Sequence, residues 1–386
     1  MKVFKLIFKN ALRHKLRTIL TVLGIAVAVI AFGILRTVVT SWSAGLEASA
    51  ANRLIARQAI SFIFPLPYTY GAKISSVPGV EEVTYANWFG GVYIDKNNFF
   101  SRIAVDPETF FTVYPEYILT KQEMETFKRE RNSCVIGSKI AKQYNLKVGD
   151  VMTLEGDIYP GEWQFTIRGI YQPKEKSTDA SQMFFQWDYL NERMKQEMSG
   201  RDGNVGWYII KISNSANSAE ISTKIDALFK NSNAETKTET ERAFTQGFIA
   251  SSGAIITAMD FMSFVIVGII MLVLGNTMIM AARERTREYA VMKTLGFSAK
   301  HIIGLILGES LFVSMLGGAL GLFFVIPIVA SFEEVIPKGF FPVFRLEETT
   351  IIMAISAAIL IGVASAVFPI IRALKTKIVD GFRFVG

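Results

Sequence analysis

Charged and apolar side chains alternate along residues 283–300, a stretch that lies between two apolar runs. Two acidic residues stand four positions apart, and an apolar stripe ending in a glycine follows, so residues 288–295 are predicted to form a short amphipathic helix. A helix of this length is not stable alone and must be held by lipid headgroups or by a protein. The pattern therefore offers docking through ion pairs and apolar contacts. The residues that we assign to docking are Glu284, Arg287, Glu288, Tyr289, Met292, Lys293, Leu295 and Gly296.

A second group of residues lies inside apolar runs. Glu309 stands about two turns into its run, where a charge is costly and suggests function, although a buried ion pair or a contact near the membrane surface is the favoured explanation. Asn276 is expected to hydrogen-bond a neighbouring helix, with a substrate contact as the alternative. Gly317, Gly318 and Gly321 have near-helical spacing, so their face is predicted to pack against another helix, within the subunit or across a dimer.

Residues for catalysis or metal binding form no recognisable motif. The sequence has no G-x-x-x-x-G-K-[ST] nucleotide loop, no G-x-S-x-G motif, no H-E-x-x-H pattern and no paired cysteines. Its two histidines, His14 and His301, lie in or beside basic segments, and Cys134 is the only cysteine. We therefore predict no catalytic residues, no metal site and no nucleotide site in this chain, which is not expected to be an enzyme by itself.

Composition indicates a membrane protein. The 386 residues are 51% hydrophobic yet 19% charged, so apolar and polar residues must be segregated along the chain. A net charge of +7 could indicate nucleic-acid binding, but the basic residues gather beside apolar runs, where the positive charge of cytoplasmic loops explains them. We therefore expect a lipid membrane and no nucleic acid as partner. Four spans are predicted, at residues 18–40, 253–282, 301–330 and 349–373.

The segments outside the spans indicate the orientation. Residues 1–17 carry basic and no acidic side chains, and they are predicted to form an amphipathic helix on the cytoplasmic surface or, equally, a solvated basic leader. The loop at residues 283–300 and the tail at residues 374–386 are basic, whereas the connection at residues 331–348 is mainly acidic. Both termini are therefore expected in the cytoplasm. We expect the first span to be retained, because its apolar run is long for a signal peptide.

Residues 41–252 contain no apolar run long enough to cross a membrane. Short strand patterns separated by turn residues predict an extracytoplasmic α+β domain. Its ends, residues 41–57 and 239–248, are expected to continue the flanking spans as helical stalks. Residues 207–238 have the pattern strand, helix, strand, as if the chain returned to complete the first half of the domain. The middle insert is predicted at about residues 134–171.

Three motifs, in the same order, resemble those of FtsX-like and MacB-like permeases of ABC transporters. The central one, R-x-R-x-R-E-x-A-x-M-K-x-L-G, begins at Arg283 and is followed by the apolar helix with Glu309 and the glycine cluster. Residues 10–24 resemble the entry into the first span of that family, and residues 364–372 resemble its last span. Residues 132–171 resemble part of its extracytoplasmic core, in which a strand-and-helix insert is attached to a larger ferredoxin-like half.

The resemblance implies a membrane α-helical fold with four transmembrane helices and an α+β extracytoplasmic domain of the MacB-like core type, with an FtsX-like region at about residues 260–380. It implies a multi-pass protein of the bacterial cytoplasmic (inner) membrane with a periplasmic domain. The short cytoplasmic helix would be the coupling helix that docks on a separate ATPase. That ATPase, in two copies, would bind ATP and Mg²⁺, and this chain would hold no cofactor. A second permease, identical or related, would complete a dimer, and a periplasmic adaptor protein is a further candidate partner.

Two functions are compatible with this resemblance. In the first, a type VII, mechanotransmission-type permease uses the partner's ATP hydrolysis to change its outer domain, and so exports or extracts an amphiphilic substrate such as a lipid, lipoprotein, haem or drug. In the second, the same movement carries no cargo and activates a cell-wall hydrolase or a sensor kinase. Efflux is preferred because residues 132–171 resemble the efflux-type outer domain.

Overall fold

The computed structural model describes residues 13–47, 49–96, 98–175, 178–198, 200–251, 253–335 and 344–376. The chain divides into two compact units. The helical unit comprises Met1–Thr40, Ala254–Glu333 and Phe344–Gly386, and the α/β unit comprises Ser41–Gly253 and Glu334–Val343. Most of the predicted N-terminal amphipathic helix, most of the C-terminal tail and part of the acidic connection lie outside the described residues.

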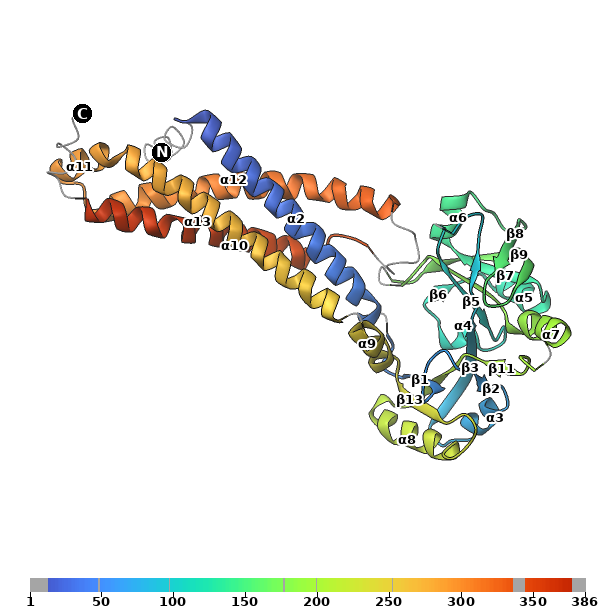
Figure 1. Cartoon of the computed structure of the whole chain (residues 1–386). Coiled ribbons are helices and arrows are strands. Elements are labelled where there is room, and N and C mark those ends of the chain that lie inside the picture. Colours follow the sequence, from blue (N-terminus) through green and yellow to red (C-terminus); the bar gives the residue numbers. More distant parts are fainter. Residues whose placement is uncertain are drawn as a thin grey trace. The chain divides into compact units, whose positions relative to one another are not determined.

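Four long helices build the helical unit (Figure 1): α2 Lys15–Glu47, α10 Gly253–Glu284, α12 Ala299–Val335 and α13 Glu348–Lys375. Each contains a segment long and apolar enough to cross a membrane, which confirms the four predicted spans. Ile25, Leu274 and Ile302 are buried between the helices, whereas Leu272 and Phe323 are about 70% exposed. Apolar residues therefore lie on all sides of the helices, as expected of a bundle whose outer surface contacts lipid.

The α/β unit is built around one eleven-stranded sheet. Its first half contains the strands β1 Arg53–Gln58, β3 Val80–Trp88, β12 Trp207–Ile212 and β13 Thr236–Thr240, with the helices α3 Tyr70–Ser75 and α8 Ser218–Leu228 and the 3₁₀ turn η1 Ser215–Asn217. The strands pair in the order β13-β1-β12-β3, all antiparallel. This β-α-β-β-α-β arrangement is ferredoxin-like. It confirms that residues 207–238 return to complete the first half.

The second half of the sheet lies between β3 and β12 in sequence. Its strands follow β3 in the order β5-β10-β7-β9-β8-β4, and β6 pairs with β9. These strands are β4 Gly91–Val92, β5 Ser101–Val105, β6 Tyr117–Ile118, β7 Ser133–Gly137, β8 Val151–Gly156, β9 Gly161–Pro173 and β10 Gln182–Gln186. The helices of this half are α4 Phe110–Val113, α5 Lys121–Arg129, α6 Ser138–Tyr144 and α7 Trp187–Glu197. A separate two-stranded sheet joins β2 Leu66–Pro67 to β11 Asn204–Val205.

The insert is larger than predicted. Strands on both sides of residues 134–171 belong to it, because β5 and β10 pair with each other in parallel and β4 pairs with β8. The inserted half therefore runs from about residue 91 to about residue 205. The sequence pattern also predicted short strands near residues 91–94 and 101–105, but it limited the insert to β7 to β9 and did not assign β4, β5 and β10 to it.

The prediction that residues 41–57 form a helical stalk is also wrong from residue 53 onward. Helix α2 ends at Glu47, and Arg53–Gln58 form strand β1, which is paired on both sides by β12 and β13. Pairing on both sides buries five of its six residues, so this segment is more stable as a strand than it would be as a solvated helix. On the other side, α9 Glu241–Ser251 begins directly after β13. The helical parts that flank the α/β unit are therefore residues 41–47 and 241–251.

Candidate functional site

The predicted short helix is present as α11, Thr286–Thr294, which begins two residues before the predicted start. It ends at Thr294, and Gly296 follows two residues later with a φ of 82°, in the left-handed region that favours glycine. The amide of Gly296 donates to the carbonyl of Lys293, and the amide of Phe297 donates to that of Met292. This is the glycine stop expected from the sequence, and it turns the chain into α12.

A buried ion pair holds the junction of α10 and α11 against α12. The Nη1 of Arg285 lies 2.6 Å from Oε2 of Glu309, and its Nη2 lies 3.3 Å from Oε1. Both side chains are less than 10% exposed. A two-point contact between a guanidinium and a carboxylate fixes distance and orientation together. Glu309 is therefore a buried partner of Arg285, the favoured sequence explanation.

The sequence missed Arg285 as a site residue. Arg283, Arg285 and Arg287 alternate along the chain, and nothing in their spacing distinguishes them. Helical geometry separates them, because Arg283 and Arg287 are exposed and Arg285 alone is buried. The sequence did contain one indication. The acidic Glu309 in α12 needs a positively charged partner, and three arginines precede α12 at residues 283–287.

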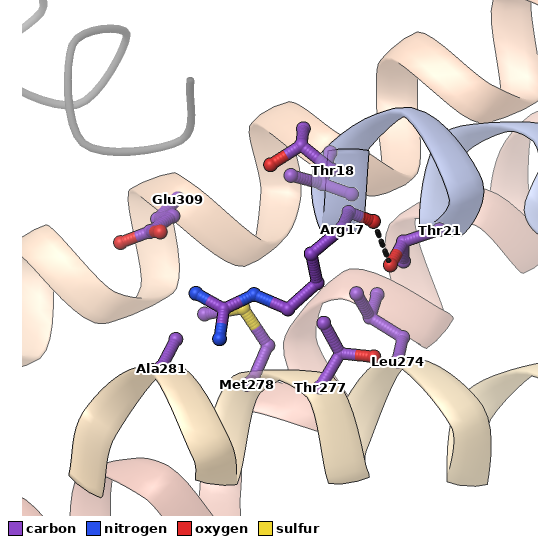
Figure 2. Close-up of a pocket in the computed structure, with 9 residues that line it drawn as sticks. Arg17, Thr18, Thr21, Leu274, Thr277, Met278, Ala281 and Glu309 are labelled. Carbon is purple, nitrogen blue, oxygen red and sulfur yellow. Dashed lines mark hydrogen bonds between the residues drawn. The ribbon is translucent and has the colours of Figure 1, made fainter. Parts of the chain in front are cut away.

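The start of α2 contacts the two acidic residues that were assigned to docking. Arg17 donates to Glu284 at 3.0 and 3.1 Å, Nε2 of His14 lies 3.2 Å from Glu284, and Arg13 pairs with Glu288. Figure 2 shows Arg17 extending from α2 over α10, beside a small pocket that Glu309 also lines. Glu284 and Glu288 are thus partly engaged inside the chain.

Lys293 attaches α11 to the end of α13. Its ammonium group donates to the carbonyls of Ala373, Leu374 and Thr376 at 2.7 to 3.0 Å. Carbonyls at the C-terminal end of a helix have no partner within the helix and carry a partial negative charge, so a lysine there is favourable. Lys293 therefore has an internal role that the sequence pattern did not indicate.

The predicted apolar stripe does not lie on one surface. Tyr289 is 5% exposed, and this burial raises the pKa of its hydroxyl to about 12. Met292 is half-buried, whereas Leu295 is 70% exposed. Tyr289 therefore packs into the bundle, and Leu295 is free to contact a partner.

Two exposed apolar residues join Leu295 and were missed by the sequence analysis. Val291 is 38% exposed and Phe297 is 48% exposed, and the exposed Arg287 lies on the same helix. We call Arg287, Val291, Leu295 and Phe297 the docking face. Val291 was missed because it falls one position outside the predicted stripe, and Phe297 because it follows the glycine stop.

The glycine face packs within the subunit. A Cβ added to Gly317 would lie 2.6 Å from Cβ of Ile25, and one added to Gly321 would lie 2.6 Å from Cβ of Val29, both in α2. A Cβ on Gly318 would lie 2.8 Å from Ala358 of α13. The glycines therefore allow α12 to approach α2 and α13 more closely than any larger residue would permit.

Asn276 does not have the predicted contact. Its side chain is exposed on the outer surface of α10, so it does not pack against a neighbouring helix of the described bundle. Its neighbours at helical spacing, Leu272 and Met280, are also exposed. Hydropathy places Asn276 within the span but does not say which side of α10 faces the bundle. The contact is therefore not made inside the described bundle, and a contact with a helix of a second permease stays a prediction.

Among the residues that the structure describes, no three His, Cys, Asp or Glu side chains lie together in a way that could hold a metal ion. The described contacts join α11 and its junction with α10 to α12, to the end of α13 and to the start of α2, while Arg287 and Leu295 stay exposed.

Comparison with known proteins matches both units. Residues 18–228 match the MacB-like periplasmic core domain, and residues 261–378 match the FtsX-like permease C-terminal domain. An uncharacterized ABC transporter permease of Methanocaldococcus jannaschii is 24% identical over 402 aligned positions, covering 97% of this chain and 96% of the relative. A second uncharacterized ABC transporter permease, from Mycobacterium tuberculosis, is 23% identical over 200 positions, 52% of this chain and 22% of that protein.

A solved structure, the periplasmic region of MacB from Actinobacillus actinomycetemcomitans, aligns with 53% of this chain and 95% of its own length, at 12% identity and a TM-score of 0.39. The MacB-like core model alone matches more than half of the chain, and the FtsX-like model covers the remaining spans. The order of the two regions is the order predicted from the three sequence motifs. The chain therefore belongs to the FtsX-like and MacB-like permeases of ABC transporters.

Proposed function

We propose that this permease transmits movement from a separate ATPase subunit to its extracytoplasmic α/β unit, and that the movement exports or extracts an amphiphilic substrate. The observation that carries the proposal is the fixation of α11. Arg285 joins it to α12, Lys293 joins it to α13, and Arg13 joins it to the start of α2. A push on α11 therefore reaches three spans without being lost in local bending.

In this proposal the docking face binds the ATPase on the cytoplasmic side. Leu295 and Phe297 supply exposed apolar area next to the exposed cation Arg287. An apolar centre with an arginine at its edge is a composition typical of protein interfaces. The partner would bind ATP and Mg²⁺, and two ATPase copies would require a second permease with its own α11.

Transmission would follow α2 and α10, which are joined near both ends. Arg17 pairs with Glu284 at the α11 end, and Arg36 pairs with Asp260 toward the other end. Two spans held at both ends are expected to move together. They lead into β1 and out of β13, which are neighbouring strands, so their movement would enter the α/β unit at one place.

The positions of the polar groups support the proposed substrate class. The described ion pairs of the bundle lie toward the ends of the spans, and their carboxylates form salt bridges with arginines. This arrangement favours work on a molecule at the outer surface over a polar path through the bundle. We therefore propose a lipid, lipoprotein, haem or amphiphilic drug, handed to a periplasmic adaptor in an export role.

Docking is tested by the variant Leu295→Asp, co-expressed with the partner ABC ATPase, which is first sought among the neighbouring reading frames. A carboxylate at the centre of an apolar contact removes about 1.5–3 kcal/mol of burial and adds a desolvation cost. We expect roughly tenfold or greater loss of co-purified ATPase. Leu228→Asp, at a leucine 49% exposed on α8 of the α/β unit, is the matched control and should retain the complex.

Equal recovery of ATPase with both variants would contradict the docking assignment. Glu288→Lys is a less specific test, because Glu288 also pairs with Arg13 and its reversal would disturb the start of α2. Leu295 has the advantage of a side chain that lies mostly in solvent, so its replacement changes the surface and not the core.

A further inference from the structure

An uncharged, strongly exposed loop connects β1 to β2 in the α/β unit. We call residues 59–65 the apolar loop. Ile60 is 82% exposed, Ile63 is 88% exposed and Phe64 is 51% exposed. No charged residue occurs between Arg57 and Lys73. Three large apolar side chains exposed in five residues, without a flanking charge, are unusual for a surface that contacts only water.

The loop is anchored beside α9. The ring of Phe62 lies 4.9 Å from that of Trp207 in β12 and 5.2 Å from that of Phe244 in α9. Phe62 therefore points into the α/β unit while its neighbours Ile60 and Ile63 point outward. Phe62 therefore anchors the loop, and Ile60 and Ile63 form its exposed apolar surface.

The backbone donors of the loop are largely satisfied within the protein. The amides of Ile60 and Ser61 donate to Oε1 of Gln58 at 2.7 and 3.0 Å, and the side chain of Gln58 is buried. The amide of Ile63 donates to Oγ of Ser61, and that of Phe64 to the carbonyl of Ser61. Pro65 has no amide hydrogen. A segment can enter an apolar layer only when its polar backbone groups have such partners.

The anchor of the loop lies close, along the chain, to a candidate span. Phe244 lies seven residues before the end of α9 at Ser251, and α10, a candidate span, begins at Gly253. Seven helical residues rise about 10 Å and two further residues add at most about 7 Å. The anchor of the loop is therefore within roughly 17 Å of the first residue of the span, whatever the angle between α9 and α10.

We infer that the apolar loop inserts Ile60, Ile63 and Phe64 into the outer leaflet of the membrane. The occupant of this surface is the lipid bilayer itself, because the loop is uncharged, most of its backbone donors are bonded and its anchor lies close along the chain to a candidate span. Apolar side chains with an aromatic residue are the composition found at membrane interfaces. The inference adds a lipid contact that the proposed ATPase docking does not require.

The test labels the loop with an environment-sensitive fluorophore. The full chain carries only Cys134, which is buried, and burial raises the pKa of its thiol, so labelling is directed to an introduced cysteine. Ile63→Cys is labelled with NBD in nanodiscs with and without doxyl-labelled phosphatidylcholine. Ile255→Cys, at an exposed position in α10, is the lipid-facing control, and Ile158→Cys, at an exposed position between β8 and β9, is the solvent control.

We expect the label at position 63 to emit at short wavelength and to be quenched by doxyl lipid at least twice as strongly as the label at position 158. Emission as in water, with quenching no stronger than at position 158, would overturn the inference. Short-wavelength emission without quenching by lipid would also overturn it, since a second copy or another protein would then cover the loop. Neither result depends on ATPase binding, so failure here is distinguishable from failure of the docking proposal.

Discussion

Arg285 and Glu309 show how a charge can lie within a bundle of apolar helices. Each would be costly if buried alone, and the two-point contact between them offsets part of that cost. Removing one partner leaves the other as a buried charge without its opposite charge, which is worse than removing both. The pair is therefore expected to determine the position of α11 more than the total stability of the bundle.

A double-mutant cycle tests this at the residue scale. We expect Glu309→Leu alone to destabilise the detergent-solubilised protein by about 3 kcal/mol, because the buried guanidinium of Arg285 loses its opposite charge. The double variant Arg285→Met with Glu309→Leu should recover most of this loss. Thermal unfolding of the single and double variants provides the measurement. A double variant as unstable as the sum of both single variants would show that the two residues do not act as a pair.

At the scale of elements, the close approach of α12 to α2 depends on glycine. Gly321 faces Val29 and the carbonyl of Ala26, and an added Cβ would lie 2.6 and 2.8 Å from them. Both distances are too short for a real Cβ, and the second neighbour is backbone, so the helices would have to separate. Glycine is tolerated inside α12 for this reason despite its poor helix propensity.

Gly321→Ala is therefore expected to destabilise the protein by about 1–3 kcal/mol through overpacking. Gly304→Ala in the same helix is the matched control, because nothing lies within 4 Å of an added Cβ there. It should be neutral or stabilising by up to about 1 kcal/mol, since alanine favours the helix. Unfolding midpoints of both variants in one detergent give the comparison. Stabilisation by both would mean that α12 and α2 are less closely packed than described.

At the scale of the molecule, the segments that lead to the spans meet the inserted half at Arg53. This buried arginine lies 2.8 Å from Glu241, the first residue of α9, and 2.7 Å from Glu116, and it donates to the carbonyl of Val113. Its guanidinium also lies 4.2 Å from the ring of Tyr114. Arg53 thus connects the start of β1, the start of α9 and the α4–β6 connection. Movement of either span would reach the inserted half through this contact.

We expect Arg53→Met to loosen the α4–β6 connection, because Glu116 and Glu241 lose a shared buried partner at a cost of about 3–5 kcal/mol. Hydrogen exchange of residues 110–118, followed by mass spectrometry in the full chain, is the measurement. Arg57→Met is the control, since Arg57 lies on the same strand and its ion pair is with Glu239 of the neighbouring strand β13. Unchanged exchange in residues 110–118 would mean that the inserted half is held independently of Arg53.

The sequence by itself determined which segments cross the membrane, the order of the two family regions, the presence of α11 and its glycine stop. These depend on local composition and on short spacings, which a single chain displays directly. It also indicated that Glu309 would find a buried partner, because the cost of a charge in an apolar layer does not depend on the fold. The extent of the insert and the length of the first stalk could not be predicted, because they depend on which distant strands pair: β12 with β1, β10 with β5 and β8 with β4.

Only the tertiary structure decided which side of each helix is covered. It turned Tyr289 and Lys293 inward, left Leu295 and Phe297 outward, and exposed Asn276 on the outer surface of α10. Helical periodicity shows which residues share one face of a helix. When apolar residues lie all around the helix, it does not show which face is turned toward the neighbouring helices. In a membrane bundle both lipid and neighbouring helices accept the same side chains, so the contacts among α2, α10, α12 and α13 were needed to separate packing residues from residues open to a partner.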